Sequence, residues 1–450
     1  MADSPRDLSR KAAARTARLA ALPAAYAGRR AVGFGKRLGG RPAEAVMSEV
    51  QQRTAEQVFR TLGTLKGGAM KMGQMLSVLE AALPEDAAAP YRDELTKLQD
   101  AAPPMATRTV REILARELGA DWQDRLVRLD GAPAAAASIG QVHRGTWHDG
   151  REVAVKVQYP DAATNLRADL KALARLAKSV GPLFPGMELG PLVAELQERS
   201  TDELDYALEA EAQRVFAEEF RDDEDIVVPD VVEVGETVLV TEWMDSAHSL
   251  ARTIAEGTQD ERDHYGELFS RFLFSGPSRT GMLHADPHPG NYRVIPAADG
   301  GPGRLGVLDY GAVARLPEAG LPRAMGSLIR IGGQNDEVGL LEGLRREGFV
   351  RDGVTIDPAL VLDYLSPFIV PTQVERFRFS RAWMREVFQR INDPRNPAFN
   401  VALKLNLPPS YLLIHRTWLG GIGVLCQLEA EAPFHAILAE WLPGFADAED

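Results

Sequence analysis

The octapeptide at 284–291, His-Ala-Asp-Pro-His-Pro-Gly-Asn, constrains the fold of this chain more than any other segment. Its two prolines and one glycine fix an irregular loop, which is where positioned polar groups concentrate when regular elements flank it. Asp286 and Asn291 are five residues apart in this loop. The sequence therefore predicts that the flanking segments position the Asp286 carboxylate and the Asn291 amide in one loop.

Metal and redox chemistry based on histidine or cysteine is disfavoured. His284 and His288 have the spacing of a helical metal pair, but Pro287 and Pro289 prevent the helix that would align their rings, so we do not expect zinc. The one cysteine, Cys426, can form neither an internal disulfide nor a Cys-based metal site. A reducing compartment follows, and we expect a cytoplasmic location.

The charge is spread unevenly. Residues 1–41 carry ten Arg or Lys against Asp3 and Asp7, a net of +8, whereas the whole chain has −13, so the remainder sums to −21. The acidic total excludes nucleic acid as the main partner, and the basic arm predicts peripheral binding to an anionic membrane surface or lipid. No apolar run is long enough to span a membrane, and no secretory segment is evident. A solvated helix, a membrane-surface helix and a transit peptide all fit residues 8–26.

The hydrophobic period predicts helices, then strands, then helices, in a chain too long for one compact core. A hairpin is expected around His148-Asp149-Gly150, a second strand pair around Gly235, and two short strands near the octapeptide. The expected helices are 44–82, 90–98, 107–118, 161–180, 191–220 and most of the chain after 258, and the expected strands are 141–145, 152–157, 231–234, 237–243, 292–295 and 305–308. This α+β order is typical of the bilobal protein-kinase-like fold.

A small-residue loop and a lysine are the predicted phosphate-binding elements. The run Ala135-Ala136-Ala137-Ser138-Ile139-Gly140-Gln141-Val142 occupies the place of Gly-x-Gly-x-x-Gly-x-Val in a kinase, with Ala135 and Ala137 replacing two glycines. An alanine-rich run by itself also fits a helix or a linker. Lys156 follows Gly140 by sixteen residues and alternates with valines, so it is expected to need an anionic partner unless it lies on an exposed edge.

Acidic residues complete the predicted site. Glu209 is our candidate partner for Lys156, and Glu211 is the fallback. Asp205 and Glu209 are four residues apart, so they are expected to share a helix face. The competing interpretation is an acidic helix face that is exposed to solvent. Asp286 and Asn291 have the spacing of the kinase catalytic loop, in which the aspartate positions the acceptor. Asp309 follows Asn291 by eighteen residues in Asp-Tyr-Gly, and we expect Asn291 and Asp309 to bind the metal.

Across roughly residues 45–320 the chain resembles the UbiB (AarF) family of atypical protein-kinase-like proteins. The resemblance is carried by the Ala-rich loop that leads into Ser138-Ile139-Gly140-Gln141-Val142-His143 and by Lys71-Met72-Gly73-Gln74. Gln99-Asp100 with Pro103-Pro104, and the pair Glu203 and Asp205, also match. Tyr310 stands where the family usually has Phe.

The resemblance implies a kinase-like fold with N-terminal helices packed over the active site, with ATP and Mg²⁺ as cofactors. It adds Glu242 and Met244 to the nucleotide-binding residues and places Lys71 and Gln74 as gating residues near Glu203 and Asp205. The implied regions are a basic arm (1–41), a helical extension (42–106), an N-lobe (107–243), a C-lobe core (244–345) and a C-terminal helical region (346–450).

The implied activity is that of an ATPase or small-molecule kinase in isoprenoid quinone or lipid metabolism, with quinone-pathway proteins as partners. Two alternatives stay open, a nucleotide-switched pseudokinase scaffold and a Ser/Thr protein kinase. Residues 346–450 carry no chemical motif, and Gly420-Gly421-Ile422-Gly423 is expected to be a helix-packing or turn segment rather than a nucleotide loop.

Overall fold

The computed structural model describes residues 104–137, 139–160, scattered residues between 162 and 174, and 204–446 except 298–299, 318–319, 394 and 403. The helices expected before residue 100, together with Lys71, Gln74, Ser138 and Glu203, lie outside the described residues. The described chain forms two compact units. The described residues within 104–207 and 233–240 form the first unit, and those within 208–232 and 241–446 form the second unit.

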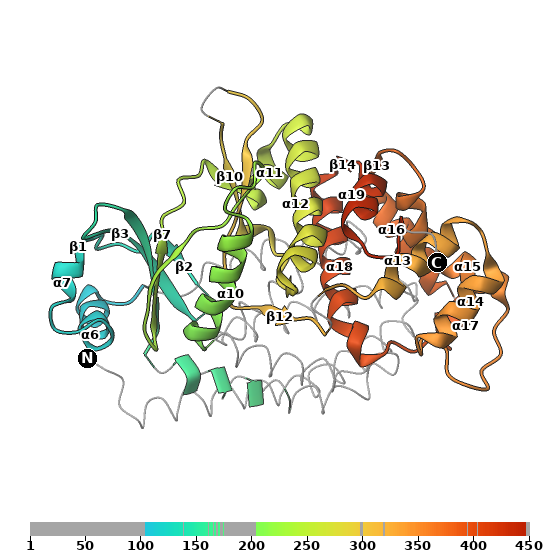
Figure 1. Cartoon of the computed structure of the whole chain (residues 1–450), viewed down its shortest axis with the longest axis horizontal. Helices are drawn as coiled ribbons and strands as arrows, with labels where there is room; N and C mark the ends of the chain where they lie inside the picture. Colours follow the sequence, from blue (N-terminus) through green and yellow to red (C-terminus); the bar gives the residue numbers. More distant parts are fainter. Residues whose placement is uncertain are drawn as a thin grey trace, which may run out of the picture. The chain divides into compact units, whose positions relative to one another are not determined.

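The first unit is built on an antiparallel sheet with strand order β1-β3-β4-β7-β6, to which β2 adds by pairing with β3 (Figure 1). The predicted hairpin and second strand pair are confirmed. Helices α6 (Thr107–Glu117) and α7 (Trp122–Arg125) belong to this unit, and the described residues between 162 and 174 are also helical, in agreement with the helix expected there. The strands of this sheet are β1 (Leu126–Leu129), β2 (Ala135–Ala136), β3 (Gly140–Trp147), β4 (Glu152–Gln158), β6 (Val231–Val234) and β7 (Val238–Glu242), of which 231–232 and 241–242 are counted with the second unit.

Buried valines alternate with less buried residues along β4, and this pattern shows which face of the sheet forms the core. Val153, Val155 and Val157 are fully buried, whereas Lys156 lies on the other face and is half-buried. A strand presents successive side chains to opposite faces, so the valines build the core and Lys156 lies on the opposite, half-exposed face.

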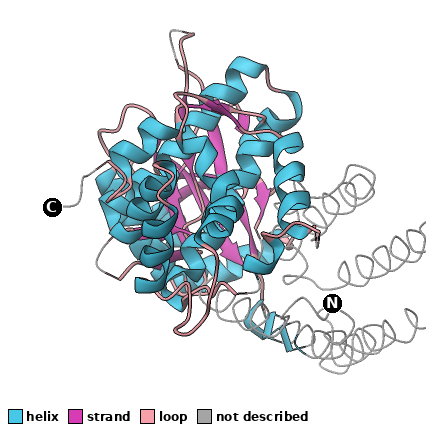
Figure 2. Ribbon diagram, turned by 90° about the vertical axis from the view of Figure 1, so that its right-hand side faces the viewer, coloured by secondary structure: helices cyan, strands magenta, loops and turns pink. Residues whose placement is uncertain are grey.

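The second unit is mainly helical, with short strands in small sheets (Figure 2). Helix α10 begins at the end of the first unit and continues into the second. The helices are α10 (Tyr206–Glu219), α11 (Leu250–Glu256), α12 (Gln259–Thr280), α13 (Arg323–Gly333), α14 (Glu337–Arg346), α15 (Pro358–Ile369), α16 (Arg381–Asn392), α17 (Phe399–Ala402), α18 (Pro409–Leu428) and α19 (Phe434–Trp441). Two 3₁₀ segments, η2 (Pro289–Asn291) and η3 (Val370–Thr372), accompany them.

The strands of this unit outnumber those expected. A four-stranded sheet has the order β5-β11-β10-β8, and β9 pairs with β12 and β13 with β14. Only β10 and β11 were predicted, because the others are two or three residues long and too short to show a period. The strands are β5 (Ile226–Val227), β8 (His248–Ser249), β9 (Met282–His284), β10 (Tyr292–Ile295), β11 (Arg304–Val307), β12 (Val313–Arg315), β13 (Phe377–Arg378) and β14 (Glu431–Ala432).

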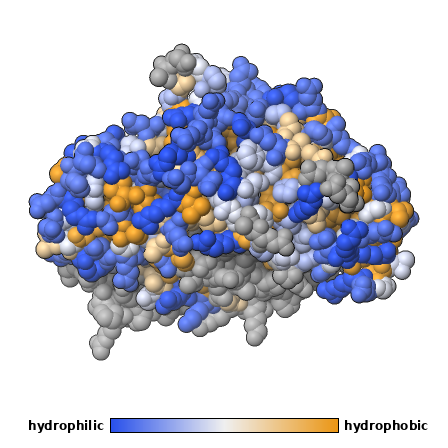
Figure 3. All heavy atoms as spheres, viewed as in Figure 1, coloured by the Kyte–Doolittle hydropathy of each residue, from blue (hydrophilic) through white to orange (hydrophobic). Residues whose placement is uncertain are grey.

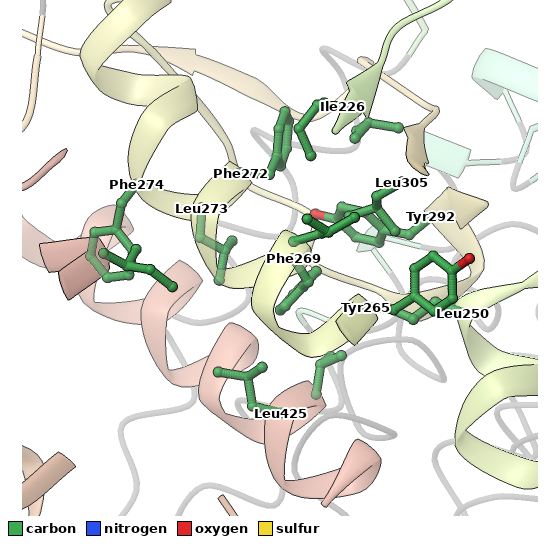
Figure 4. Packing of buried hydrophobic residues seen from close by; sticks show 14 of the residues in the cluster. Ile226, Leu250, Tyr265, Phe269, Phe272, Leu273, Phe274, Tyr292, Leu305 and Leu425 are labelled. Atoms are coloured by element: carbon green, nitrogen blue, oxygen red, sulfur yellow. The ribbon is translucent and has the colours of Figure 1, made fainter. Parts of the chain in front are cut away.

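Helix α12 is the centre of the main core of the second unit. Figure 4 shows Phe269 and Phe272 from α12 beside Tyr292 from β10, with Leu425 from α18 in the same cluster. A Cβ on Gly421 would lie 2.4 Å from a methyl group of Leu273, so the glycine allows α18 to approach α12. The glycine-rich run therefore packs helices, as predicted.

Cys426 lies in the same core. It is fully buried on α18, and burial raises the pKa of its thiol well above the ordinary value. A second, smaller core gathers around Leu340, Leu341 and Val361 of α14 and α15. The face drawn in Figure 3 has polar and apolar residues interspersed. Within the described ranges, no helix has the length and apolar character that a membrane span requires.

Candidate active site

Three predicted nucleotide-binding residues form a row on one face of the first sheet. Ala135 pairs with Val142, and Val142 pairs with Lys156, across three antiparallel strands. Directly opposed residues in such ladders point to the same side, so the alanine-rich strand, the valine and the lysine share a face. Ala135 and Ala136 are exposed strand residues, not the helix or linker that their composition also allowed.

The Ala-rich strand turns tightly into β3. Ala137 and Gly140 exchange backbone hydrogen bonds, with Ala137 N–H to Gly140 O at 2.9 Å and the reverse bond at 3.4 Å. A Cβ on Gly140 would lie 2.3 Å from the carbonyl oxygen of Val157. The glycine is therefore required by the close approach of β4, in addition to any role in binding phosphate.

Gly140→Ala is expected to destabilise the first unit by about 1–3 kcal/mol, because the clash is with backbone and forces the strands apart. Thermal unfolding measures the change. Gly131→Ala is the matched control, since nothing lies within 4 Å of its added Cβ and its stability should be unchanged. Equal melting temperatures for the two variants would contradict the steric argument.

Lys156 has an aromatic neighbour that the sequence did not reveal. Its Nζ lies 5.3 Å from the ring centroid of Tyr206, within the range of a cation–π contact. Asp205 precedes α10, and its Oδ1 accepts a hydrogen bond from the Ala207 N–H at 3.0 Å. Asp205 therefore caps α10 from the position before its first residue, whereas the sequence placed it inside the helix.

Glu209 and Glu211 differ in surroundings. Glu209 is buried at 3% exposure in the first turn of α10. Glu211 is exposed and forms an ion pair with Arg315 of β12 at 2.6 Å. The fallback residue thus has another partner, so Glu209 stays the predicted partner of Lys156. Helix α10 packs against the residue after Asp309, because the ring centroid of its Phe216 lies 5.1 Å from that of Tyr310.

The octapeptide lies between β9 and β10 and is ordered by its own polar groups. The Asn291 Nδ2 donates to Asp286 Oδ2 at 3.1 Å and to the Asp286 carbonyl oxygen at 3.3 Å. Since a carboxylate only accepts, the amide nitrogen of Asn291 faces it and the amide oxygen is turned elsewhere. His288 Nδ1 accepts from the Gly290 N–H at 3.1 Å and stabilises η2.

The Asp309 loop is tied to this octapeptide. The Leu308 N–H donates to the Asn291 carbonyl at 2.8 Å, and the Ala285 N–H donates to the Ala312 carbonyl at 2.8 Å. Asp309 has a φ of +62°, a left-handed conformation that aspartate and asparagine tolerate better than most residues. The two oxygen-donor segments are therefore held to each other within one unit.

His284 makes the third tie, a role that its sequence position did not suggest. Its Nε2 lies 2.9 Å from the Asp309 carbonyl oxygen and 3.4 Å from that of Leu308. Carbonyl oxygens only accept, so Nε2 carries the proton. Burial lowers the pKa of His284, against the opposing effect of the Asp286 and Asp309 charges, which favours the neutral ring.

Tyr310, in the place of a family phenylalanine, is fully buried. Burial raises its pKa well above the ordinary value, and its hydroxyl has no hydrogen-bond partner among the described residues. Tyr310→Phe is expected to leave stability unchanged or raise it by up to ~1 kcal/mol, because an unsatisfied hydroxyl is removed.

Tyr411→Phe is the contrasting variant for thermal unfolding. The Tyr411 hydroxyl donates to Glu347 Oε2 at 2.7 Å, so its loss should cost about 1 kcal/mol. A Tyr310→Phe protein that is destabilised as much as Tyr411→Phe would show that the buried hydroxyl is satisfied.

The two remaining predicted residues, Glu242 and Met244, lie just after residue 241, where the chain re-enters the second unit. Glu242 ends β7, and its N–H donates to the Asp230 carbonyl at 2.9 Å. Met244 is half-buried, and its sulfur would lie 2.0 Å from a Cβ on Gly306, so β11 carries a glycine where this side chain crosses it.

The donor atoms suit a magnesium ion. Mg²⁺ is normally held by one or two carboxylates together with substrate phosphates, and Asp309 and the Asn291 amide oxygen are donors of this kind. Across the described part of the chain, no group of three or more His, Cys, Asp or Glu side chains could hold a metal by itself. The residues therefore fit a metal shared with a nucleotide.

Residues 97–335 match the family model of the ABC1 atypical kinase-like domain. AarF domain-containing protein kinase 1 of Mus musculus is 32% identical over 277 residues, which cover 60% of this chain and 51% of that protein. Atypical kinase coq-8, mitochondrial, of Caenorhabditis elegans is 31% identical over 327 residues, which cover 72% and 42%. The chain thus spans about half the length of the curated relatives it matches.

A solved structure is similar over nearly the whole chain. It is the complex of Rv3197 with erythromycin from Mycobacterium tuberculosis, 38% identical with a TM-score of 0.67, and the match covers 90% of this chain and 100% of that one. At this identity and TM-score, the two chains share the α+β kinase-like fold described above.

Proposed function

Because the chain belongs to the ABC1 atypical kinase-like family, we propose that it binds ATP with Mg²⁺ and hydrolyses it or transfers its terminal phosphate to a small molecule of isoprenoid quinone or lipid metabolism. One observation carries the proposal. The Asp286 loop and the Asp309 loop are joined by hydrogen bonds from Leu308 and Ala285 and by the His284 ring. Phosphoryl transfer depends on positioning and electrostatics, for which such joined donors are suited.

Each residue has a proposed role. Asp309 and Asn291 hold the metal, which when bound neutralises phosphate charge, and Asp286 orients the attacking water or hydroxyl. Lys156 binds phosphate oxygens with Glu209 as its partner. The backbone around Ala135–Ala137, Ser138, Gly140 and Val142 cradles the phosphates, and Glu242 and Met244 contact the base. Lys71, Gln74, Glu203 and Asp205 restrict access of acceptors.

Phosphate release and phosphate transfer separate the candidate activities. The full chain is incubated with MgATP alone, with vesicles containing anionic lipid, and with generic Ser/Thr peptides. We expect phosphate release that vesicles stimulate and peptide phosphorylation at background level. Peptide phosphorylation above release would indicate a protein kinase, and binding without turnover would indicate a scaffold. Asp286→Asn is the inactive control.

A second candidate function is macrolide binding, favoured by the similarity to the erythromycin complex. Here the chain would bind a bulky, largely apolar small molecule. Thermal shift with erythromycin, in the presence and absence of MgATP, tests it. A shift in melting temperature that saturates with erythromycin supports the idea, and an unchanged melting temperature at saturating concentration rejects it.

A further inference from the structure

Two polar side chains are buried on the face of β3 that points away from Lys156. Gln141 and His143 are each 1% exposed and pair with Val157 and Val155 of the core-forming β4. Polar groups in such a place are costly unless each finds a partner, so each of these two side chains is expected to be hydrogen-bonded.

Gln141 and His143 belong to a series of hydrogen bonds in which each group donates to the next one. The Met105 N–H donates to Gln141 Oε1 at 2.8 Å, which turns the amide nitrogen of Gln141 toward His143 Nε2 at 2.6 Å. His143 Nδ1 lies 2.9 Å from the carbonyl oxygen of Asp130, which can only accept. The series is satisfied throughout by one arrangement, a neutral His143 with its proton on Nδ1.

We call this series of hydrogen bonds from Met105 through Gln141 and His143 to Asp130 the relay, and it ends at Asp130, a few residues before the Ala-rich strand β2. The Asp130 N–H donates to the Arg144 carbonyl at 2.8 Å, so Asp130 is held by β3 through backbone and through His143. Four residues later the Ala134 N–H donates to the Val142 carbonyl at 2.8 Å, and Ala135 and Ala136 pair with β3. Anchoring Asp130 therefore sets the path on which β2 enters the sheet.

We propose that Gln141 and His143 are positioning residues that fix the course of the Ala-rich strand and thereby decide which phosphates its backbone reaches. This role rests on the proposed nucleotide binding. The two side chains act through Asp130 and β2 from the opposite face of the sheet. They set the preference between ATP and ADP, which differ by one charged phosphoryl group at the end of the phosphate chain.

The first test is spectroscopic and independent of nucleotide. ¹⁵N shifts of labelled histidine, assigned with the His143→Asn variant, should show Nδ1 protonated and Nε2 unprotonated for His143 at neutral pH. His284 should show the opposite tautomer, since its Nε2 faces carbonyl oxygens. A His143 ring that is protonated on Nε2 would overturn the relay.

The second test separates positioning from general stability. An asparagine at 143 places its amide nitrogen near the position of Nδ1 and keeps the link to Asp130, whereas a glutamine reaches the position of Nε2 and loses that link. We expect His143→Gln to change the ratio of ATP to ADP dissociation constants by about fivefold or more and His143→Asn to keep the wild-type ratio.

Thr237→Val is the matched control in the same unit. It removes a hydroxyl that bonds to Glu117 Oε1 at 2.9 Å, so it should lower stability and leave the ratio unchanged. Equal ratios in all four proteins would overturn the positioning role while leaving nucleotide binding intact. A wild-type chain with no affinity for either nucleotide would instead reject the proposed function, and with it the role in phosphate selection.

Discussion

Asp309→Asn is expected to abolish Mg²⁺-dependent nucleotide binding, with a loss of about 100-fold or more in affinity for MgATP. The carboxylate is the proposed direct metal ligand, and a neutral amide oxygen replaces a full charge with a dipole. Asparagine also tolerates the φ of +62° at this position, so the backbone should be retained. The loss is therefore assigned to the ligand and not to misfolding.

Calorimetric titration with ATP, in Mg²⁺ and in a chelator, measures this effect. The wild-type chain should lose affinity when Mg²⁺ is removed, and Asp309→Asn should bind equally weakly in both conditions. Asp357→Asn is the matched control, since Asp357 caps α15 by accepting from the Ala359 N–H at 3.1 Å and lies in no proposed site. Undiminished binding by Asp309→Asn in Mg²⁺ would show that the metal is held elsewhere.

Asp286→Asn is expected to keep the MgATP dissociation constant within about threefold and to lower kcat by about 10²–10⁴-fold. Its proposed role is to orient the acceptor, which matters for the chemical step and little for ground-state binding. An asparagine oxygen can still accept the bond from Asn291 Nδ2, so the loop geometry should persist. Steady-state kinetics and titration on the same preparation measure both quantities. Equal loss of affinity in the Asp286 and Asp309 variants would contradict the division of roles.

Much of the fold could be read from the sequence, because the longer elements carry strong periods. β4 alternates buried valines with Lys156, and β3, β7 and α6 match the predicted segments within a few residues. The short strands β9 and β12 could not be predicted. Each is three residues long and exists because it pairs with the other, so its signal is a tertiary contact and not a local pattern.

Candidate site residues could be named where a motif has fixed spacing, as for Lys156, Asp286, Asn291 and Asp309. What these residues do is still a prediction. The supporting residues were missed, because nothing in the sequence shows that the ring of His284 bonds to the carbonyl of Asp309 or that Tyr206 lies against Lys156. The start of α10 was also missed, because the expected helix ran through Asp205, whereas α10 begins at Tyr206 and Asp205, a residue type that favours caps, accepts from the Ala207 N–H.

The single buried Cys426 makes labelling experiments on this protein unusually simple. Its thiol is fully enclosed in the core of the second unit and its pKa is raised, so alkylating reagents react only when that core opens. The rate of modification thus reports the opening of the second unit without any engineered probe. Since the chain has no other cysteine, a thiol introduced on the surface of the first unit would accept a fluorophore alone under native conditions.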